Sequence, residues 1–301
     1  PITVRGKSGV RPVLTVSNTN QVIDGTQSYW WFENLELVQQ GASGSVVALS
    51  SSQNDVFYNV KISDGGADAI VNTSQNIRIF GCEITYASGG TNALNLSAGW
   101  VIGNYIHDLT AGAAIALGST AGPSVCIGNV VDTCSAQGIS IYGAPGSVSA
   151  DTYHLVYGNT GYGCGNTGLE IADKELAIMI FNNIFSENGN AAGEYNVEFV
   201  DTLGGLICSH YGNVFLHSGG GGGANLSGIT ANATESTSDP LFTNAAGGDF
   251  SLQTGSPALA AGFPTQFLGG NANYLDIGAV QKQLVAAAAR GTALGGQLLL
   301  A

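Results

Sequence analysis

The stretch VIGNYI at residues 101–106 decides the fold, because it returns as CIGNVV at 126–131 and as VYGNTG at 156–161. In each copy an aliphatic or aromatic residue, one variable residue and Asn follow one another. The pattern recurs with its Asn at the following positions: Asn34, Asn59, Asn104, Asn129, Asn159, Asn183 and Asn213. Gly81 takes the place of an Asn after Asn59, and successive copies are 22 to 30 residues apart. This period indicates a repeat protein in which each copy forms one structural unit.

Each copy also contains a second short strand, such as NALNL, AAIAL, GISIY or GLEIA, and none contains a helical stretch. Leucine-rich repeats have similar lengths but need a regular Leu frame, which this chain lacks. We therefore predict an all-β fold, a parallel β-helix of about eight coils stacked at a strand spacing of about 4.8 Å. In such a stack, Asn and Gly supply left-handed corners, and Asn side chains bond to their own copies in neighbouring coils.

Two stretches resemble the ends of known β-helix proteins. SDPLFTNAAGGDFSLQTGSPALAAG (238–262), followed by LDIGAVQ (275–281), resembles the closing coil of right-handed parallel β-helix proteins of the pectate-lyase-like superfamily. PITVRGKSGVRPVLTV (1–16) resembles their first coils. The resemblance implies a right-handed helix. That superfamily includes polysaccharide lyases, glycoside hydrolases, phage tailspikes and structural proteins without catalysis, so the resemblance leaves the chemistry open.

These observations divide the chain into three parts. Residues 1–238 are expected to form the coils, with a Gly-rich loop at 217–228, and residues 239–280 the closing coil. The Ala-rich and apolar tail 281–301 is expected to cap the helix or to join other subunits, with a homo-oligomer such as a trimer as one form of assembly.

The charge of the chain limits its partners. It has 301 residues, with 21 Asp and Glu against 8 Lys and Arg, which gives a net charge of −13. This balance argues against nucleic acid and against an anionic membrane surface. No apolar run reaches the roughly 18–20 residues of a membrane span. We expect an extracellular, secreted or virion-surface protein whose partner is a polysaccharide.

A pair of carboxylates recurs in this chain of few charges. GLEIADKE (168–175) and NVEFVD (196–201) place Glu170 and Asp173 at an offset of 28 residues from Glu198 and Asp201. Because strand side chains alternate, the apolar neighbours of each Glu point inward and both Glu side chains point outward, about 5 Å apart on successive coils. Earlier coils carry uncharged residues at this position: Asn95, Ala116 and Ser140.

Three interpretations of the four carboxylates stay open. Carboxyl groups about 5 Å apart suit retaining glycoside hydrolysis, and a wider pair such as Glu170 with Asp201 suits inversion. The four side chains could instead bind Ca²⁺, although no cofactor is required for hydrolysis. Outward acids also keep a sheet soluble and block edge pairing without any further role.

Long loops beside this face favour a functional role. The segments 143–153 and 186–195 would flank the carboxylates and present Tyr142, Tyr153 and Tyr195 to a sugar. Lys174 adjoins the carboxylates as a substrate-binding residue, or as the base of a Ca²⁺-assisted polysaccharide lyase, a minor alternative. The main rival is a structural β-helix, such as a tail fibre, a virion decoration or a filament subunit.

Cysteine and histidine give weaker signals. The five Cys residues have no CxxC spacing, which predicts buried thiols, with a stacked pair or a disulfide between Cys134 and Cys164 as the alternative. His154 is expected to be a satisfied turn residue rather than a member of the site.

Overall fold

The fold was examined in a computed structural model of the 301-residue chain. The structure describes the following residues: 2–18, 20–41, 44–50, 52–63, 66–72, 76–85, 92–110, 112–118, 122–142, 153–172, 177–189, 193–200, 207–217, 224–262 and 276–281. In this part of the chain, no helix is long and apolar enough to cross a membrane.

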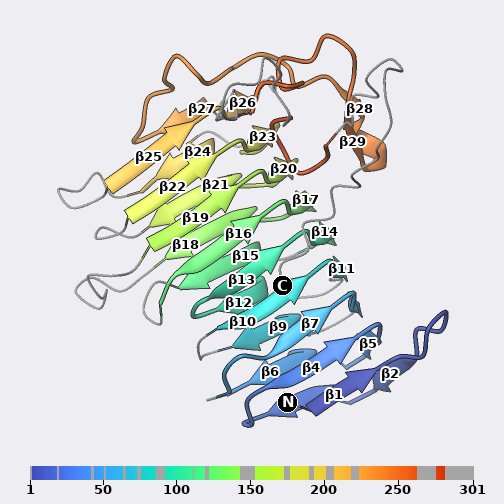
Figure 1. Cartoon of the computed structure of the whole chain (residues 1–301). Helices are drawn as coiled ribbons and strands as arrows, with labels where there is room; N and C mark the ends of the chain where they lie inside the picture. Colours follow the sequence, from blue (N-terminus) through green and yellow to red (C-terminus); the bar gives the residue numbers. More distant parts are fainter. Residues whose placement is uncertain are drawn as a thin grey trace, which may run out of the picture.

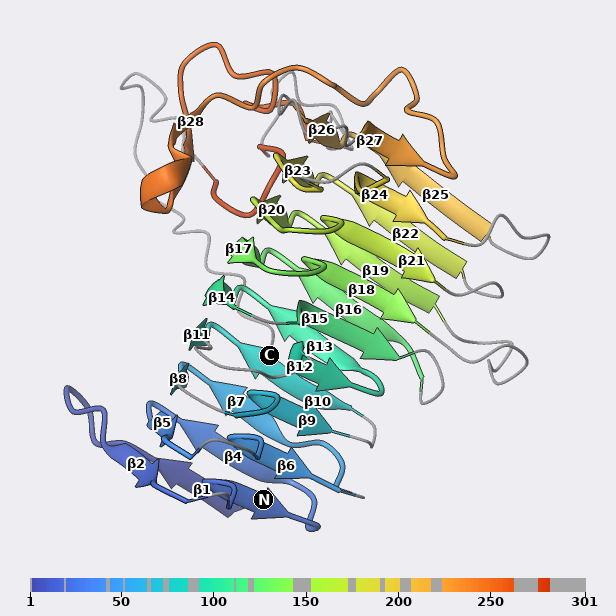
Figure 2. The same ribbon diagram turned by 180° about the vertical axis from the view of Figure 1, so that it is seen from behind.

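Three parallel sheets of nine strands each form the walls of a solenoid (Figures 1 and 2). Sheet A consists of β1 (Ile2–Arg5), β4 (Trp30–Glu33), β7 (Val56–Tyr58), β10 (Ile77–Phe80), β13 (Gly99–Ile102), β16 (Ser124–Ile127), β19 (Tyr153–Tyr157), β22 (Ala177–Phe181) and β25 (Ile207–Tyr211). Sheet B consists of β2 (Val13–Val16), β5 (Glu36–Gln39), β8 (Lys61–Ser63), β11 (Glu83–Thr85), β14 (Tyr105–Leu109), β17 (Val130–Cys134), β20 (Thr160–Tyr162), β23 (Ile184–Ser186) and β26 (Val214–Leu216). Sheet C consists of β3 (Ile23–Gly25), β6 (Val47–Leu49), β9 (Ile70–Asn72), β12 (Asn92–Leu96), β15 (Ala113–Gly118), β18 (Ile139–Tyr142), β21 (Leu169–Ala172), β24 (Tyr195–Phe199) and β27 (Ala224–Ser227).

Each strand from β1 to β24 pairs in parallel with the strand three places later in the chain, so the predicted parallel β-helix is confirmed. The nine strands per sheet include a first coil that the Asn pattern does not mark, because Gly6 follows β1 where Asn34 follows β4. Alternate side chains point into the solenoid, where Phe57, Phe185 and Phe215 are completely buried. Stacking therefore gives the coils a shared apolar core that a single coil could not form.

The repeated Asn residues occupy two different positions, which the sequence pattern had merged into one. Asn34 and Asn59 have φ values of 53° and 51° and lie at the left-handed corner that Gly81 and Gly103 occupy in later coils. The second position comes one residue later and faces the interior. It holds an apolar residue or Cys in three early coils, namely Leu35, Val60 and Cys82, and Asn from Asn104 onward.

At this second position the predicted Asn ladder exists in five coils: Asn104, Asn129, Asn159, Asn183 and Asn213. All five side chains are buried. Asn159 is typical: its Oδ1 accepts from the backbone N–H and from Nδ2 of Asn129, both at 2.9 Å. Its Nδ2 donates to the backbone oxygen of Cys126 at 2.8 Å and to Oδ1 of Asn183 at 3.0 Å. Each amide thus satisfies buried backbone groups at a corner where the chain leaves its strand ladder.

Residues 232–236 close the C-terminal end of the ladder. Nδ2 of Asn213 donates to Oε1 of Glu235 at 2.7 Å, and the backbone N–H of Asn232 donates to Oε2 at 2.9 Å. His210 Nδ1 lies 3.0 Å from both oxygens of this buried carboxylate. Ser236 pairs with Val214 as a further parallel bridge. The backbone of this segment therefore covers the last coil.

Of residues 239–280, which the sequence suggested as the closing coil, the structure describes 239–262 and 276–280. The described part forms a two-stranded antiparallel sheet, β28 (Phe242–Asn244) and β29 (Asp249–Leu252), joined by the 3₁₀-helix η1 (Ala245–Gly247). The rings of Phe242 and Phe250 lie 6.2 and 5.6 Å from the ring of Tyr162 on the outer face of sheet B. The segment covers the side of the solenoid there because its aromatic residues meet an outward-facing Tyr.

A second apolar cluster fixes this segment beside sheet B. Ile184 and Val214 point outward from β23 and β26 and pack against Leu252, Ala258 and Ile277. The backbone N–H of Gly278 donates to the oxygen of Asn182, which places the chain against the wall again after 262. The predicted tail 281–301 lies outside the described residues apart from its first residue, Gln281.

Part of the predicted Gly-rich loop is a strand. The residues Ala224–Ser227 form β27, which pairs in parallel with β24 and supplies the ninth strand of sheet C. Leu226 packs against the core between two polar neighbours. This alternation explains why the stretch can join the sheet despite the five preceding Gly residues.

All five Cys residues are free thiols, so the disulfide alternative for Cys134 and Cys164 is wrong. These two buried thiols are neighbours. Burial, followed by the neighbouring Cys134 thiol, raises the pKa of Cys164 well above its ordinary value. They act as core residues rather than as reactive nucleophiles.

Candidate functional site

Glu170 and Glu198 lie directly opposite each other on neighbouring strands of sheet C. The register pairs Glu170 of β21 with Glu198 of β24, and Ser140 of β18 with Glu170. Both Glu side chains are half-buried, while their strand neighbours Leu169 and Ile171 are buried in the core. The predicted outward stacking of the two carboxylates is confirmed, and so is the uncharged column that precedes it, Asn95, Ala116 and Ser140.

Glu170 is held by two neighbouring hydrogen-bond donors. Nε2 of Gln137 donates to Oε2 at 3.0 Å, and the Ser140 hydroxyl donates to Oε1 at 2.9 Å. Both residues belong to the preceding coil, so each carboxylate oxygen has a donor on its N-terminal side. Together these two donors fix the orientation of the group.

Glu198 has fewer donors and more negative neighbours. The Thr167 hydroxyl lies 3.4 Å from Oε2 of Glu198 and also 3.4 Å from Oε2 of Glu194. Burial, followed by the charge of Glu170, raises the pKa of Glu198 above its ordinary value. The two stacked carboxyl groups therefore differ: Glu170 has two close hydrogen-bond donors, and Glu198 has the raised pKa.

This difference predicts how acidity changes stability. A carboxyl whose pKa is raised by folding binds its proton more tightly in the folded chain, so the free energy of unfolding falls as the pH rises from below 4.5 to above the raised value. Glu198→Gln removes this pH-dependent contribution to the free energy of unfolding. We expect the variant to gain stability relative to the unsubstituted protein between pH 4 and pH 7, measured by urea denaturation at both values. A Glu194→Gln control separates this effect from a general loss of negative charge. A difference that shrinks as the pH rises would contradict the prediction.

Two of the three predicted sugar-binding tyrosines lie on strands of sheet C, the sheet that carries both carboxylates. Tyr142 is the outward residue two positions after Ser140, and its hydroxyl donates to Oδ1 of Asn95 at 2.9 Å, which turns it toward the N-terminal coils. Tyr195 begins β24, three residues before Glu198. Tyr153 does not share this face: it begins β19 of sheet A, because the chain has passed the corner between the sheets by then.

Three predicted site residues, Asp173, Lys174 and Asp201, lie outside the described residues, so their proposed roles stay predictions. Among the residues that the structure does describe, no group of three His, Cys, Asp or Glu side chains could hold a metal ion. No strand of sheet C contains Lys or Arg. His154 is completely buried and points into the solenoid from β19.

The sequence reasoning missed the residues that distinguish the two carboxylates: Gln137, Thr167 and Glu194. A signal was present, since a polar residue precedes each outward position of the column by three, in QGIS (137–140) and TGLE (167–170). Gln137 and Thr167 precede β18 and β21, and their side chains reach the outward Glu of the next coil, Glu170 and Glu198 respectively.

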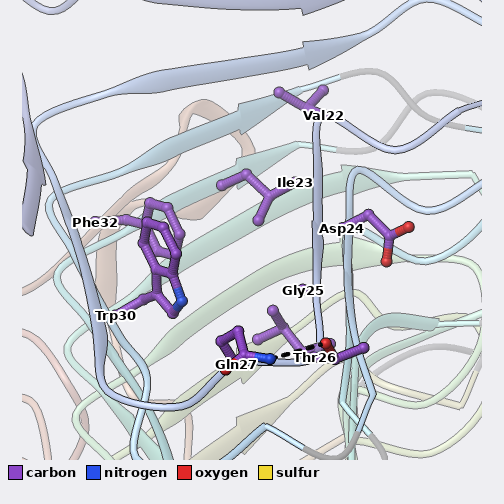
Figure 3. A pocket seen from close by; sticks show the side chains of 9 residues that line it. Val22, Ile23, Asp24, Gly25, Thr26, Gln27, Trp30 and Phe32 are labelled. Atoms are coloured by element: carbon purple, nitrogen blue, oxygen red, sulfur yellow. Dashed lines mark hydrogen bonds between the residues drawn. The ribbon is translucent and has the colours of Figure 1, made fainter. Parts of the chain in front are cut away.

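Two cavities of the described structure lie away from this pair. One, of about 360 Å³, opens at the N-terminal end of the solenoid between Ile23, Trp30 and Phe32, where the first coil leaves the core uncovered (Figure 3). The other, of about 600 Å³, lies between Tyr162 and the segment that carries Phe242. Neither is lined by Glu170 or Glu198.

Comparison with known proteins gives one match. Residues 44–236 match the family model described as the right handed beta helix region, which spans most of the solenoid and includes both Glu170 and Glu198. No curated protein and no solved structure matches the chain.

Proposed function

We propose, from the premise that this chain belongs to the right-handed β-helix family, that its sheet C wall binds and cleaves a polysaccharide by glycoside hydrolysis. The observation that carries the proposal is the pairing of Glu170 and Glu198 in opposite environments. One carboxyl group has two donors and the other a raised pKa. A retaining glycosidase needs two carboxyl groups in different roles, one as the nucleophile and one as the acid.

The strand register favours retention of configuration. Neighbouring parallel strands are about 4.8 Å apart, close to the roughly 5–5.5 Å that separates the carboxyl groups of retaining enzymes. Glu198 would donate its proton to the glycosidic oxygen as the bond to the anomeric carbon breaks, and Glu170 would form the new bond to that carbon. Glu198 would then take a proton from water, whose oxygen displaces Glu170.

The wall around the pair supports a sugar substrate. Tyr142 and Val200 expose apolar surface in the outward column on one side of the carboxylates, and Thr167 and Tyr195 flank them on the other. An exposed aromatic ring can stack on the apolar face of a sugar, while the half-buried Gln137 can bond to hydroxyl groups. Action on an extracellular or virion-exposed polysaccharide is part of this proposal.

A panel of neutral and acidic polysaccharides tests the proposal, with and without Ca²⁺. New reducing ends and the absorbance of unsaturated uronates would both be followed, with the double variant Glu170→Gln/Glu198→Gln as the matched control. Reducing ends without unsaturation, lost in the double variant, are the expected result. Unsaturated products would instead favour the Ca²⁺-assisted lyase with Lys174 as its base. Cleavage that survives in the double variant would overturn the assignment of the site.

A structural β-helix without catalysis is the second candidate function. It is favoured by the position of the two cavities, because neither of them, in the described part of the chain, is lined by Glu170 or Glu198. A fibre or decoration subunit needs no cleft. Absence of cleavage across the panel, with the double variant equally folded and equally assembled, would select this function.

A further inference from the structure

The outer face of sheet A is apolar over most of the length of the solenoid. One outward column runs from Tyr58 through Phe80, Ile102, Ile127 and Tyr157 to Phe181. Tyr211 continues it on the last strand. The residues of this column lie outside the core, and Tyr58 and Tyr211 expose 46% and 40% of their surface. Surfaces of single soluble proteins rarely keep so long an apolar patch uncovered.

A parallel outward column has the same character. It contains Trp31, Trp100, Leu155 and Met179, with Trp31 and Trp100 exposed to 39% and 37%. Tyr, Trp, Phe and Met are the residues enriched in the cores of protein interfaces. The other walls differ: sheet C carries small polar residues and the two Glu, and sheet B carries an ion pair between Lys61 and Glu83.

Charge is nearly absent from this face, although the chain as a whole carries −13. Arg5 and Glu33 form an ion pair of 2.7 Å at its N-terminal end. The guanidinium of Arg78 lies over the ring of Trp100, 6.0 Å from its centroid. The outward columns of the nine strands contain no other Lys, Arg, Asp or Glu. Two copies of the chain repel each other through their acidic surfaces but can approach through this wall.

The repeat of the wall indicates which partner fits it. Side chains recur every 4.8 Å or so along nine strands, and an α-helix with its pitch of about 5.4 Å falls half a repeat out of step within about four turns. The same wall on another copy has the identical rise and stays in phase along its whole length. A sugar chain fits less well, because Ile102, Ile127 and Leu155 at the middle of the wall offer no hydrogen bonds to hydroxyl groups.

The outer face of sheet A is large enough for a specific interface. Eight strand spacings of about 4.8 Å and four to five residues of about 3.3 Å give a flat area of about 500 Å² on each copy. A pair of walls therefore buries about 1,000 Å², the lower bound for a specific interface.

We propose that the outer face of sheet A is a self-association surface that joins two copies of this chain side by side. The proposal does not depend on the catalytic one, since the carboxylates lie on sheet C. Ile102 of β13, the fifth of nine strands, lies at the centre of the wall, where interface residues contribute most to affinity.

Sedimentation velocity of the full chain between 1 and 100 μM tests the proposal. We expect a species of twice 30.5 kDa that dissociates on dilution. Ile102→Glu places a carboxylate from each copy at the centre of the contact, and we expect it to raise the dissociation constant at least about 100-fold. Tyr58→Lys, at a site already half exposed, is expected to act in the same direction with little effect on folding.

Val71→Glu is the matched control, because Val71 is an outward apolar residue on β9 of sheet C. Far-ultraviolet circular dichroism shows whether each variant is folded. A chain that stays monomeric at 100 μM would overturn the proposal, and so would a dimer that Ile102→Glu and Tyr58→Lys leave intact. A monomer whose Trp fluorescence responds to soluble oligosaccharides, with the response lost in both variants, would also overturn it and assign the wall to glycan binding.

Discussion

Glu198→Gln is expected to lower the rate of polysaccharide cleavage about 1,000-fold, because the variant cannot protonate the departing glycosidic oxygen. The same variant should still release an activated aryl leaving group, since such a group departs without a proton. Glu170→Gln should lose both activities, because no nucleophile then attacks the anomeric carbon. The two substitutions therefore separate the two roles that the hydrogen bonds and the raised pKa assign.

The measurement is the initial rate of reducing-end formation on the polysaccharide that the panel identifies, beside release of an aryl alcohol from the matching glycoside. Glu194→Gln serves as the control, because Glu194 shares the Thr167 hydroxyl with Glu198 but is not in register with Glu170. We expect its rate to fall by less than about tenfold, as for a neighbour that only tunes the acid. Equal losses in all three variants would contradict the assignment of roles.

Asn159→Ala is expected to reduce the free energy of unfolding by about 4 kcal/mol, because it removes hydrogen bonds from four buried groups. The backbone N–H of Asn129 and the oxygen of Cys126 lose their bonds to this side chain, and Nδ2 of Asn129 and Oδ1 of Asn183 each lose one of their bonds. Asn159 is completely buried, so bulk solvent does not replace the lost partners. Urea denaturation followed by circular dichroism would measure the loss.

Asn34→Gly is the matched control, since Asn34 has the same sequence pattern but lies at the left-handed corner with φ 53°. Gly adopts that conformation without strain, and the hydrogen bonds of Asn34 are exposed to water. We expect a loss below about 1 kcal/mol. Similar losses for Asn159→Ala and Asn34→Gly would show that the buried ladder has no special contribution.

The fold and the stacked pair were accessible from the sequence for one physical reason. Outward and inward side chains alternate along a strand, and each coil repeats the alternation, so the spacing of Glu170 and Glu198 fixes both their face and their neighbours. The same reasoning could not separate corner Asn residues from ladder Asn residues. The preceding residue marks the difference, because only one residue per corner takes a positive φ. That residue is Gly103 before Asn104, whereas Asn34 takes the positive φ itself after Glu33.

Other features depend on contacts without a period. The segment that carries β28 and β29 reaches the outer face of sheet B through Phe242, Phe250 and Tyr162, three rings that no repeat relates. The contrast between the two carboxylates likewise arises from Gln137 and Thr167, whose hydrogen bonds depend on the exact position of side chains rather than on spacing.

The Asn ladder also has a direction. From Asn104 to Asn183 every side-chain amide donates one N–H to the Oδ1 of the next Asn, so the amide oxygens from Asn129 to Asn213 face the N-terminal end. Aligned peptide groups sum to a macrodipole in an α-helix, and a file of aligned amides does the same along this solenoid. Its positive pole lies at the last coil, where the buried carboxylate of Glu235 receives the final N–H. The negative charge of Glu235 thereby matches the positive pole at this end of the solenoid, as an acidic residue does at the N-terminus of a helix.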